Sequence, residues 1–172
     1  GWSAQAVTLQ LNLLDDRHAA LLLQAQRVAL PDGFGELSAL TLSCARAQFT
    51  TTAVSCAEGI LKTQSTLLGQ QHIQLTFRYQ LDSGRIDTAL RGIHAYDGTL
   101  ALRARLSDTR WQIDATGTAL SLPAVTRQLV ATGIALPVVA GSAGLDVTAQ
   151  LSGVSSQLQE ADVAARLLAE EV

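Results

Sequence analysis

The sequence predicts a mainly β protein, a long-stranded antiparallel meander that forms a curved open sheet with one short helix near residues 123–131. Apolar and polar residues alternate with a period of two along much of the chain, which is typical of antiparallel strands with one apolar and one solvated face. Turn signals such as Asp97-Gly98 separate the alternating runs. Apolar residues make up 48% of the 172 residues but aromatic residues only 4%, so the apolar face is almost entirely aliphatic.

The N-terminal part contains an alternating run at 7–13 and two cysteines, Cys44 and Cys56. Both cysteines lie in strand-like segments that a Thr-rich bend joins. They form either a disulfide, which would contribute about 3 kcal/mol, or two buried thiols. We favour the disulfide, which indicates the periplasm or the cell exterior.

The central part, between Gln71 and Leu122, contains regularly spaced turn signals. It therefore predicts four consecutive strands of about ten residues each, longer than is usual. The strand at 85–95 changes phase, and this predicts a β-bulge near Gly92.

The C-terminal part begins with the helix, because Pro123 suits a first helical position and apolar residues then recur at helical spacing. A loop at 133–144 and an alternating strand at 145–151 follow. The tail at 156–172 is compatible with a helix or a final strand, and we favour the strand. We expect one β-rich domain over 1–172, a fragment of a longer protein, with a candidate sub-boundary near 65–70.

Several classes of function are disfavoured. The net charge of −3 argues against a nucleic-acid partner, and no apolar run is long enough to span a membrane. The three histidines, His18, His72 and His94, are isolated from one another, and two cysteines alone cannot complete a zinc site. We therefore expect no metal, no cofactor and no enzymatic activity.

Charged residues on the strands have a plain interpretation. Asp87 and Asp114 lie among arginines and are expected to form cross-strand pairs on the polar face. An enzyme acting on carbohydrate through these carboxylates is an alternative. The arginines at 85, 91, 103, 105 and 110 are interpreted as solubilising, with a phosphate-binding rim as the alternative.

The apolar face of the sheet needs a cover, and a helix of about ten residues, roughly 15 Å long, covers only part of it. The sheet therefore either closes as a sandwich or leaves an aliphatic groove. Such a groove suits acyl chains, since each buried methylene contributes about 0.8 kcal/mol. The phase of the alternation gives the candidate groove residues Ile73, Leu75, Phe77, Tyr79, Leu100, Leu102, Leu106, Trp111, Ile113, Leu145 and Val147.

The stretch from Gln71 to about Gly153 resembles the AsmA-like family (TamB-type, YdbH-like) of Gram-negative envelope proteins. The resemblance rests on the long alternating strands and on two segments. The first starts at Trp111 and reads W-x-I…G…L-x-L-P before a short helix. The second, 143–153, is similar to the G-x-L-x-L-x-x-x-L-S-G strands that the family repeats.

The resemblance implies an open-grooved sheet, a β-taco, in a periplasmic protein anchored in the inner membrane. Its groove would carry phospholipid acyl chains toward the outer membrane, and the family has no catalytic residues or cofactor to transfer. We therefore expect a non-catalytic periplasmic module of an intermembrane phospholipid transport or envelope-integrity protein. The alternative is a structural module of an envelope or secretion assembly, which pairs its edge strands with another envelope protein.

Overall fold

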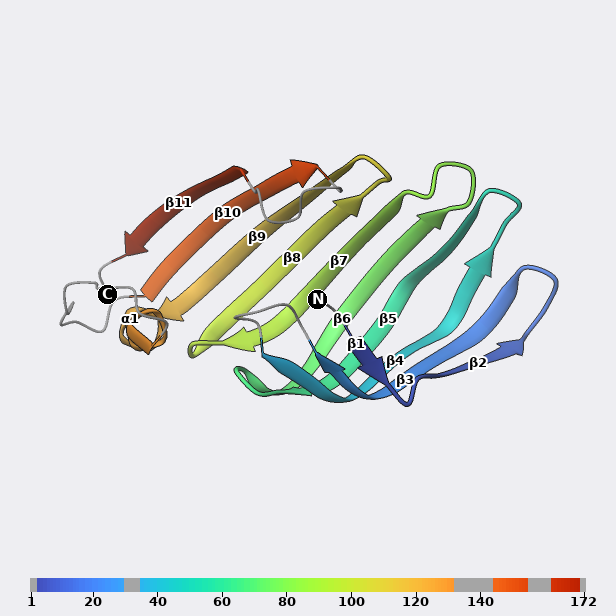
Figure 1. Ribbon diagram of the computed structural model, residues 1–172, viewed down its shortest axis with the longest axis horizontal. Helices are drawn as coiled ribbons and strands as arrows, with labels where there is room; N and C mark the ends of the chain where they lie inside the picture. The colour runs from blue at the N-terminus through green and yellow to red at the C-terminus, as the bar shows by residue number, and fades with distance from the viewer. Residues whose placement is uncertain (1–2, 30–34, 132–143, 155–161, 171–172) are drawn as a thin grey trace.

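The computed structural model describes residues 3–29, 35–131, 144–154 and 162–170, whose strands form one eleven-stranded antiparallel sheet (Figure 1). Within this part of the chain, neighbours in sequence are also neighbours in the sheet, except that β1 and β2 both pair with β3. The strands are β1 (Ser3–Gln5), β2 (Thr8–Leu13), β3 (His18–Ala29), β4 (Glu36–Phe49), β5 (Ala53–Ser65), β6 (Gly69–Gln80), β7 (Ile86–Ala95), β8 (Gly98–Leu106), β9 (Arg110–Ser121), β10 (Gly144–Val154) and β11 (Asp162–Glu170). The predicted fold class is confirmed.

The central strands match their sequence signals closely. The strands β6 to β9 are 12, 10, 9 and 12 residues long. The predicted bulge is present, because the β7–β8 register shifts between Leu90 and Ile93. Gly92 lies inside this shift with a φ of 75°, a value that glycine adopts without the steric cost of a Cβ.

The N-terminal residues continue the same sheet. Residues 66–68, at the candidate sub-boundary, form the turn between β5 and β6, which pair along their length. The helix α1 (Leu122–Ala131) forms where predicted, and it is the one helix among the described residues. It is too short to span a membrane. Of the tail, Asp162–Glu170 is strand β11; the predicted loop lies outside the described residues, except Gly144, which begins β10.

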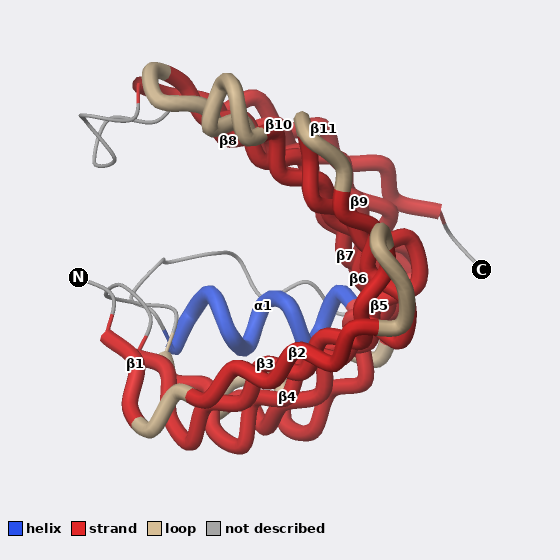
Figure 2. The backbone as a smooth tube through the Cα atoms, turned by 90° about the vertical axis from the view of Figure 1, so that its right-hand side faces the viewer, coloured by secondary structure: helices blue, strands red, loops and turns tan. Residues whose placement is uncertain are grey.

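The sheet is strongly curved. Viewed along its long axis it has a C-shaped outline with α1 inside the curve (Figure 2). The turns at 14–17, 50–52, 81–85 and 107–109 follow one side of the sheet, which we call the upper rim. Because strands alternate in direction, every second turn lies on this rim.

A disulfide between Cys44 and Cys56 joins the adjacent strands β4 and β5, with a Cα–Cα distance of 6.2 Å. Both cysteines are buried together with Ala47. Three larger side chains from β3, β4 and β6 pack against this cluster: Leu21, Phe49 and Phe77. The cluster is therefore a small local core that a covalent bond reinforces.

Candidate functional site

The aliphatic face of the sheet is the first candidate site. The strand register brings all the sequence-predicted groove residues to this one face. For example, Leu75, Leu90 and Leu102 lie opposite one another on β6, β7 and β8. The buried members are Ile73, Leu75 and Leu145; the half-buried ones are Phe77, Leu100, Leu102, Trp111, Ile113 and Val147; and the exposed ones are Tyr79 and Leu106.

The exposure pattern assigns this face to the inner side of the curve. On β6, Ile73 and Leu75 are buried whereas His72, Gln74 and Thr76 are exposed. Side chains on the inner side of a bent sheet converge and shield one another, and those on the outer side spread into solvent.

The end of β9 that leads into α1 supports the same assignment. Leu120 and Leu145 lie opposite each other there and are only 4% and 7% exposed. A Cβ placed on Gly117 would lie 2.7 Å from the side chain of Leu120 and 3.0 Å from that of Leu100. These leucine side chains therefore converge over a glycine on the same face as the predicted groove residues.

The inner face extends beyond the residues predicted for it. The register places Leu11, Leu21 and Cys44 on one row across β2, β3 and β4. The alternation at 7–13 carried the signal for β2. The run from Ala19 to Leu23 is apolar throughout, so its sequence did not reveal which side chains share the face.

The inner face is open in the part of the chain that the structure describes. The substantial contacts between elements there are those of paired strands and of α1 with β9. No second layer of described residues covers the sheet, so the sandwich that the sequence left open as an alternative does not form among them.

The outer face is polar and carries ordered charge pairs. Asp87 accepts a hydrogen bond from Arg85 Nη2 at 2.9 Å, and Arg105 Nε lies 3.8 Å from the same carboxylate. Asp114 accepts hydrogen bonds from Gln112 and Gln150 at 3.0 and 2.9 Å. These two bonds, with a smaller contribution from nearby arginines, hold the pKa of Asp114 below its usual value.

These contacts bear on the carboxylates considered for catalysis. Asp87 and Asp114 are held by arginine and glutamine on the outer face rather than facing each other across the inner one. Among the described residues, no three histidine, cysteine or acidic side chains are placed to share a metal ion.

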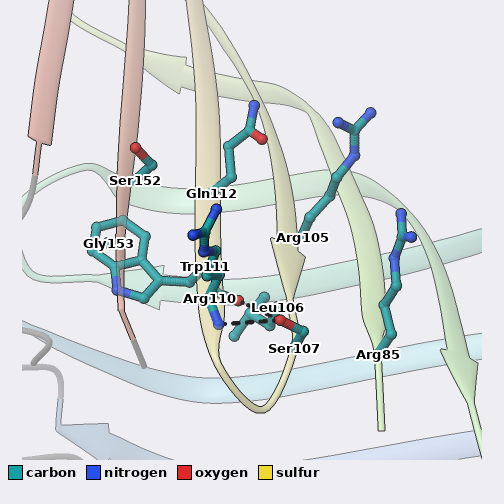
Figure 3. A pocket seen from close by; sticks show the side chains of 9 residues that line it. All are labelled: Arg85, Arg105, Leu106, Ser107, Arg110, Trp111, Gln112, Ser152 and Gly153. Atoms are coloured by element: carbon teal, nitrogen blue, oxygen red, sulfur yellow. Dashed lines mark hydrogen bonds between the residues drawn. The ribbon is translucent and has the colours of Figure 1, made fainter. Parts of the chain in front are cut away.

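A hollow of about 630 Å³ at the upper rim is the second candidate site (Figure 3). It lies where β8 turns into β9, between the start of β7 and the end of β10. It is lined by Arg85, Arg105, Leu106, Ser107, Arg110, Trp111, Gln112, Ser152 and Gly153.

Strand register explains how these residues meet. Arg105, Gln112 and Ser152 form one row across β8, β9 and β10, and Arg85 and Arg105 extend to the same side (Figure 3). The sequence predicts, as an alternative, a phosphate-binding rim of five arginines. It does not separate Arg85, Arg105 and Arg110 from the other two, because the proximity of these three depends on strand register.

Trp111 lies at the junction between the hollow and the inner face. It pairs with Gly153 on β10, where a Cβ would come within 2.8 Å of the indole ring. The glycine therefore leaves room for the ring to lie over the neighbouring strand. The Nε1–H of this indole is buried and has no hydrogen-bond acceptor among the described residues.

Comparisons with known proteins do not assign this chain to a family. No family model matches the chain, and no curated protein or solved structure matches it. The resemblance to AsmA-like proteins therefore stays a prediction that rests on the residues alone.

Proposed function

We propose that this chain is a non-catalytic periplasmic module whose inner aliphatic face binds lipid acyl chains, as part of an intermembrane phospholipid transport or envelope-integrity protein. The observation that carries the proposal is the aliphatic inner face, which runs across the strands and which no described element except α1 approaches. The disulfide between Cys44 and Cys56 adds support for an oxidising compartment.

The chemistry of this face suits acyl chains. Soluble monomers rarely expose contiguous apolar patches larger than a few hundred Å² unless these serve binding. An acyl chain needs no directional partner, and about ten buried methylenes would contribute roughly 8 kcal/mol before the costs of association. A mainly aliphatic surface discriminates little between chains, which fits a carrier of lipids.

The test is native mass spectrometry of the protein after incubation with vesicles of palmitoyl-oleoyl phosphatidylglycerol. Leu75→Asp combined with Leu102→Asp places two charges on the inner face, on strands β6 and β8. We expect this variant to bind at least tenfold less phospholipid than the wild type, because each carboxylate would be desolvated beneath the acyl chain.

The matched control is Thr76→Asp with Thr99→Asp, which adds the same charge to exposed positions of the same two strands on the outer face. We expect this control to bind lipid as the wild type does. Circular dichroism establishes that both variants keep their strands. Equal binding by all three proteins, or equal loss in both folded variants, would contradict the proposal.

One observation favours the structural alternative, in which the sheet edge pairs with a partner strand. The edge strand β2 carries no charge, and its leucines Leu9, Leu11 and Leu13 are 61%, 44% and 80% exposed. Natural edge strands are usually protected by charge. If edge pairing is the function, Gln10→Lys with Asn12→Lys should abolish association with other β proteins, measured by light scattering, and leave lipid binding unchanged.

A further inference from the structure

The geometry of the upper rim points to a second part of the ligand site. We propose that Arg85, Arg105 and Arg110 bind a phosphoryl group, that of a lipid whose acyl chains lie on the inner face. The inference rests on the proposed function and extends it, because it assigns the residues that hold the phosphoryl group of the lipid.

The hollow is rich in hydrogen-bond donors and carries an excess of positive charge. Of the nine residues that line it in the described part of the chain, three are arginines and none is acidic. The guanidinium group presents several N–H donors in a planar fork that matches phosphate oxygens. Among the described residues Arg110 forms no ion pair, so its charge is available to a ligand.

The ion pairs of Asp87 neutralise this cluster only in part. Asp87 accepts a hydrogen bond from Arg85 and lies 3.8 Å from Arg105 Nε, so one carboxylate is shared by two guanidinium groups. Asp108 lies beside Gly84, in the turn next to the hollow. Among the described ion pairs, Asp87 is the one carboxylate that meets the arginines of the hollow, so one paired negative charge faces three positive ones.

The position of the hollow matches an amphipathic ligand. The arginines belong to the outer polar face and its turns, whereas Leu106 and Trp111 lie opposite each other on the inner face. A phosphoryl group held by the arginines would lie at the border between the two faces. Chains attached to it would reach the aliphatic surface over the rim.

Trp111 supplies an independent indication that an acceptor belongs here. Its buried Nε1–H lacks an acceptor among the described residues, and an unsatisfied buried donor is unfavourable. An ester oxygen of a lipid on the inner face, where the ring lies, would satisfy it. A tryptophan with one apolar and one hydrogen-bonding end is also typical of borders between apolar and polar surroundings.

The experiment compares three probes by isothermal titration calorimetry: dihexanoyl phosphatidic acid, dihexanoylglycerol and inorganic phosphate. The hollow variant is Arg85→Gln, Arg105→Gln and Arg110→Gln. The control variant is Arg46→Gln, Arg91→Gln and Arg127→Gln, which removes the same charge from exposed positions that do not line the hollow.

We expect the wild type to bind phosphatidic acid at least tenfold more tightly than diacylglycerol, as charge-assisted hydrogen bonds to three guanidinium groups allow. The hollow variant should bind both lipids equally, and the control should keep the preference. The preference should also weaken as salt is raised.

The remaining outcomes separate this inference from the proposed function. Equal affinity of the wild type for the two lipids overturns the phosphoryl site and leaves acyl binding standing. If the control variant also loses the preference for phosphatidic acid, the phosphoryl site is overturned, because net charge rather than these three arginines would then be responsible. Binding of inorganic phosphate alone, lost in the hollow variant, keeps the phosphoryl site but overturns a lipid as its source; binding of no probe overturns both proposals.

Discussion

The strands β4 and β5 and the strands β7 to β10 are stabilised in different ways. In the first region a disulfide and Ala47 form a buried cluster, and Leu21, Phe49 and Phe77 pack over it. In the second, the described residues form no comparable cluster, and glycines set the packing. The side chains of Leu100 and Leu120 converge over Gly117, and the Trp111 ring lies against Gly153.

This difference indicates that stability and ligand access are divided between the two regions. A single-layer sheet buries little apolar surface, so the disulfide region contributes a local core and a covalent restraint. The glycines of the second region leave room for the large side chains that lie over them, and the described element that covers the inner face there is α1 alone. The predictions below test this division, in order of decreasing effect.

The largest effect is expected in the disulfide region. Replacing both cysteines, Cys44→Ala with Cys56→Ala, should lower the free energy of unfolding by about 3 kcal/mol, because the unfolded chain regains the freedom of the closed loop. Urea denaturation measures it. A loss below about 1 kcal/mol would mean that this region is not the stabilising part of the sheet.

A close backbone contact in the second region gives the next effect. A Cβ on Gly98 would lie 2.6 Å from the carbonyl oxygens of Thr118 and Ala119 on β9. We expect Gly98→Ala to lower the free energy of unfolding by about 1–3 kcal/mol. Gly144→Ala is the control, because nothing lies within 4 Å of its Cβ position, and equal effects of the two would contradict the packing described.

At the rim, Gly153→Ala should lower the free energy of unfolding by a smaller amount. The new methyl group would displace the Trp111 ring, at a cost of about 1 kcal/mol. In a Trp2→Phe background Trp111 is the remaining tryptophan, and its fluorescence should shift to longer wavelength as the indole becomes more exposed. An unchanged spectrum would show that the ring does not lie over Gly153.

The smallest effect concerns Asp114, whose pKa its hydrogen bonds with Gln112 and Gln150 lower. A carboxyl group with a lower pKa in the folded than in the unfolded protein stabilises the fold above the unfolded pKa and loses this contribution as the pH falls. Below about pH 4 the wild type should lose a few tenths of a kcal/mol that Asp114→Asn does not lose. Urea denaturation at pH 6 and pH 3 tests this, and parallel losses in both proteins would contradict it.

Sequence patterns predicted most of the fold between Gln71 and Ser121, because alternation, Asp-Gly turns and the phase change at Gly92 are local signals. They did not predict β3, whose run from Ala19 to Leu23 does not alternate. They also did not predict the sign of the curvature. Alternation separates two faces but does not determine which becomes the inner one, and residues such as Ala39 and Ala119, with φ of 49° and 53°, carry no sequence signal for their conformation.

The candidate site was predictable to different degrees in its two parts. The aliphatic face follows from alternation, so its members on β6, β8, β9 and β10 could be named in advance. The rim hollow depends on the register that brings Arg105 beside Gln112 and on the turn that places Arg85 near Arg110. These are tertiary relations, and composition alone could not distinguish the three arginines from the others.

The central claim is that the inner aliphatic face holds acyl chains, and photo-crosslinking tests it most directly. A phospholipid with a diazirine in its acyl chain is bound and irradiated, and tandem mass spectrometry locates the adducts to single residues. We predict adducts at inner-face positions such as Leu75, Leu90 and Leu102, and none at Gln74, Thr76 or Arg103. Adducts on the outer face, or none on a folded protein, would contradict the account.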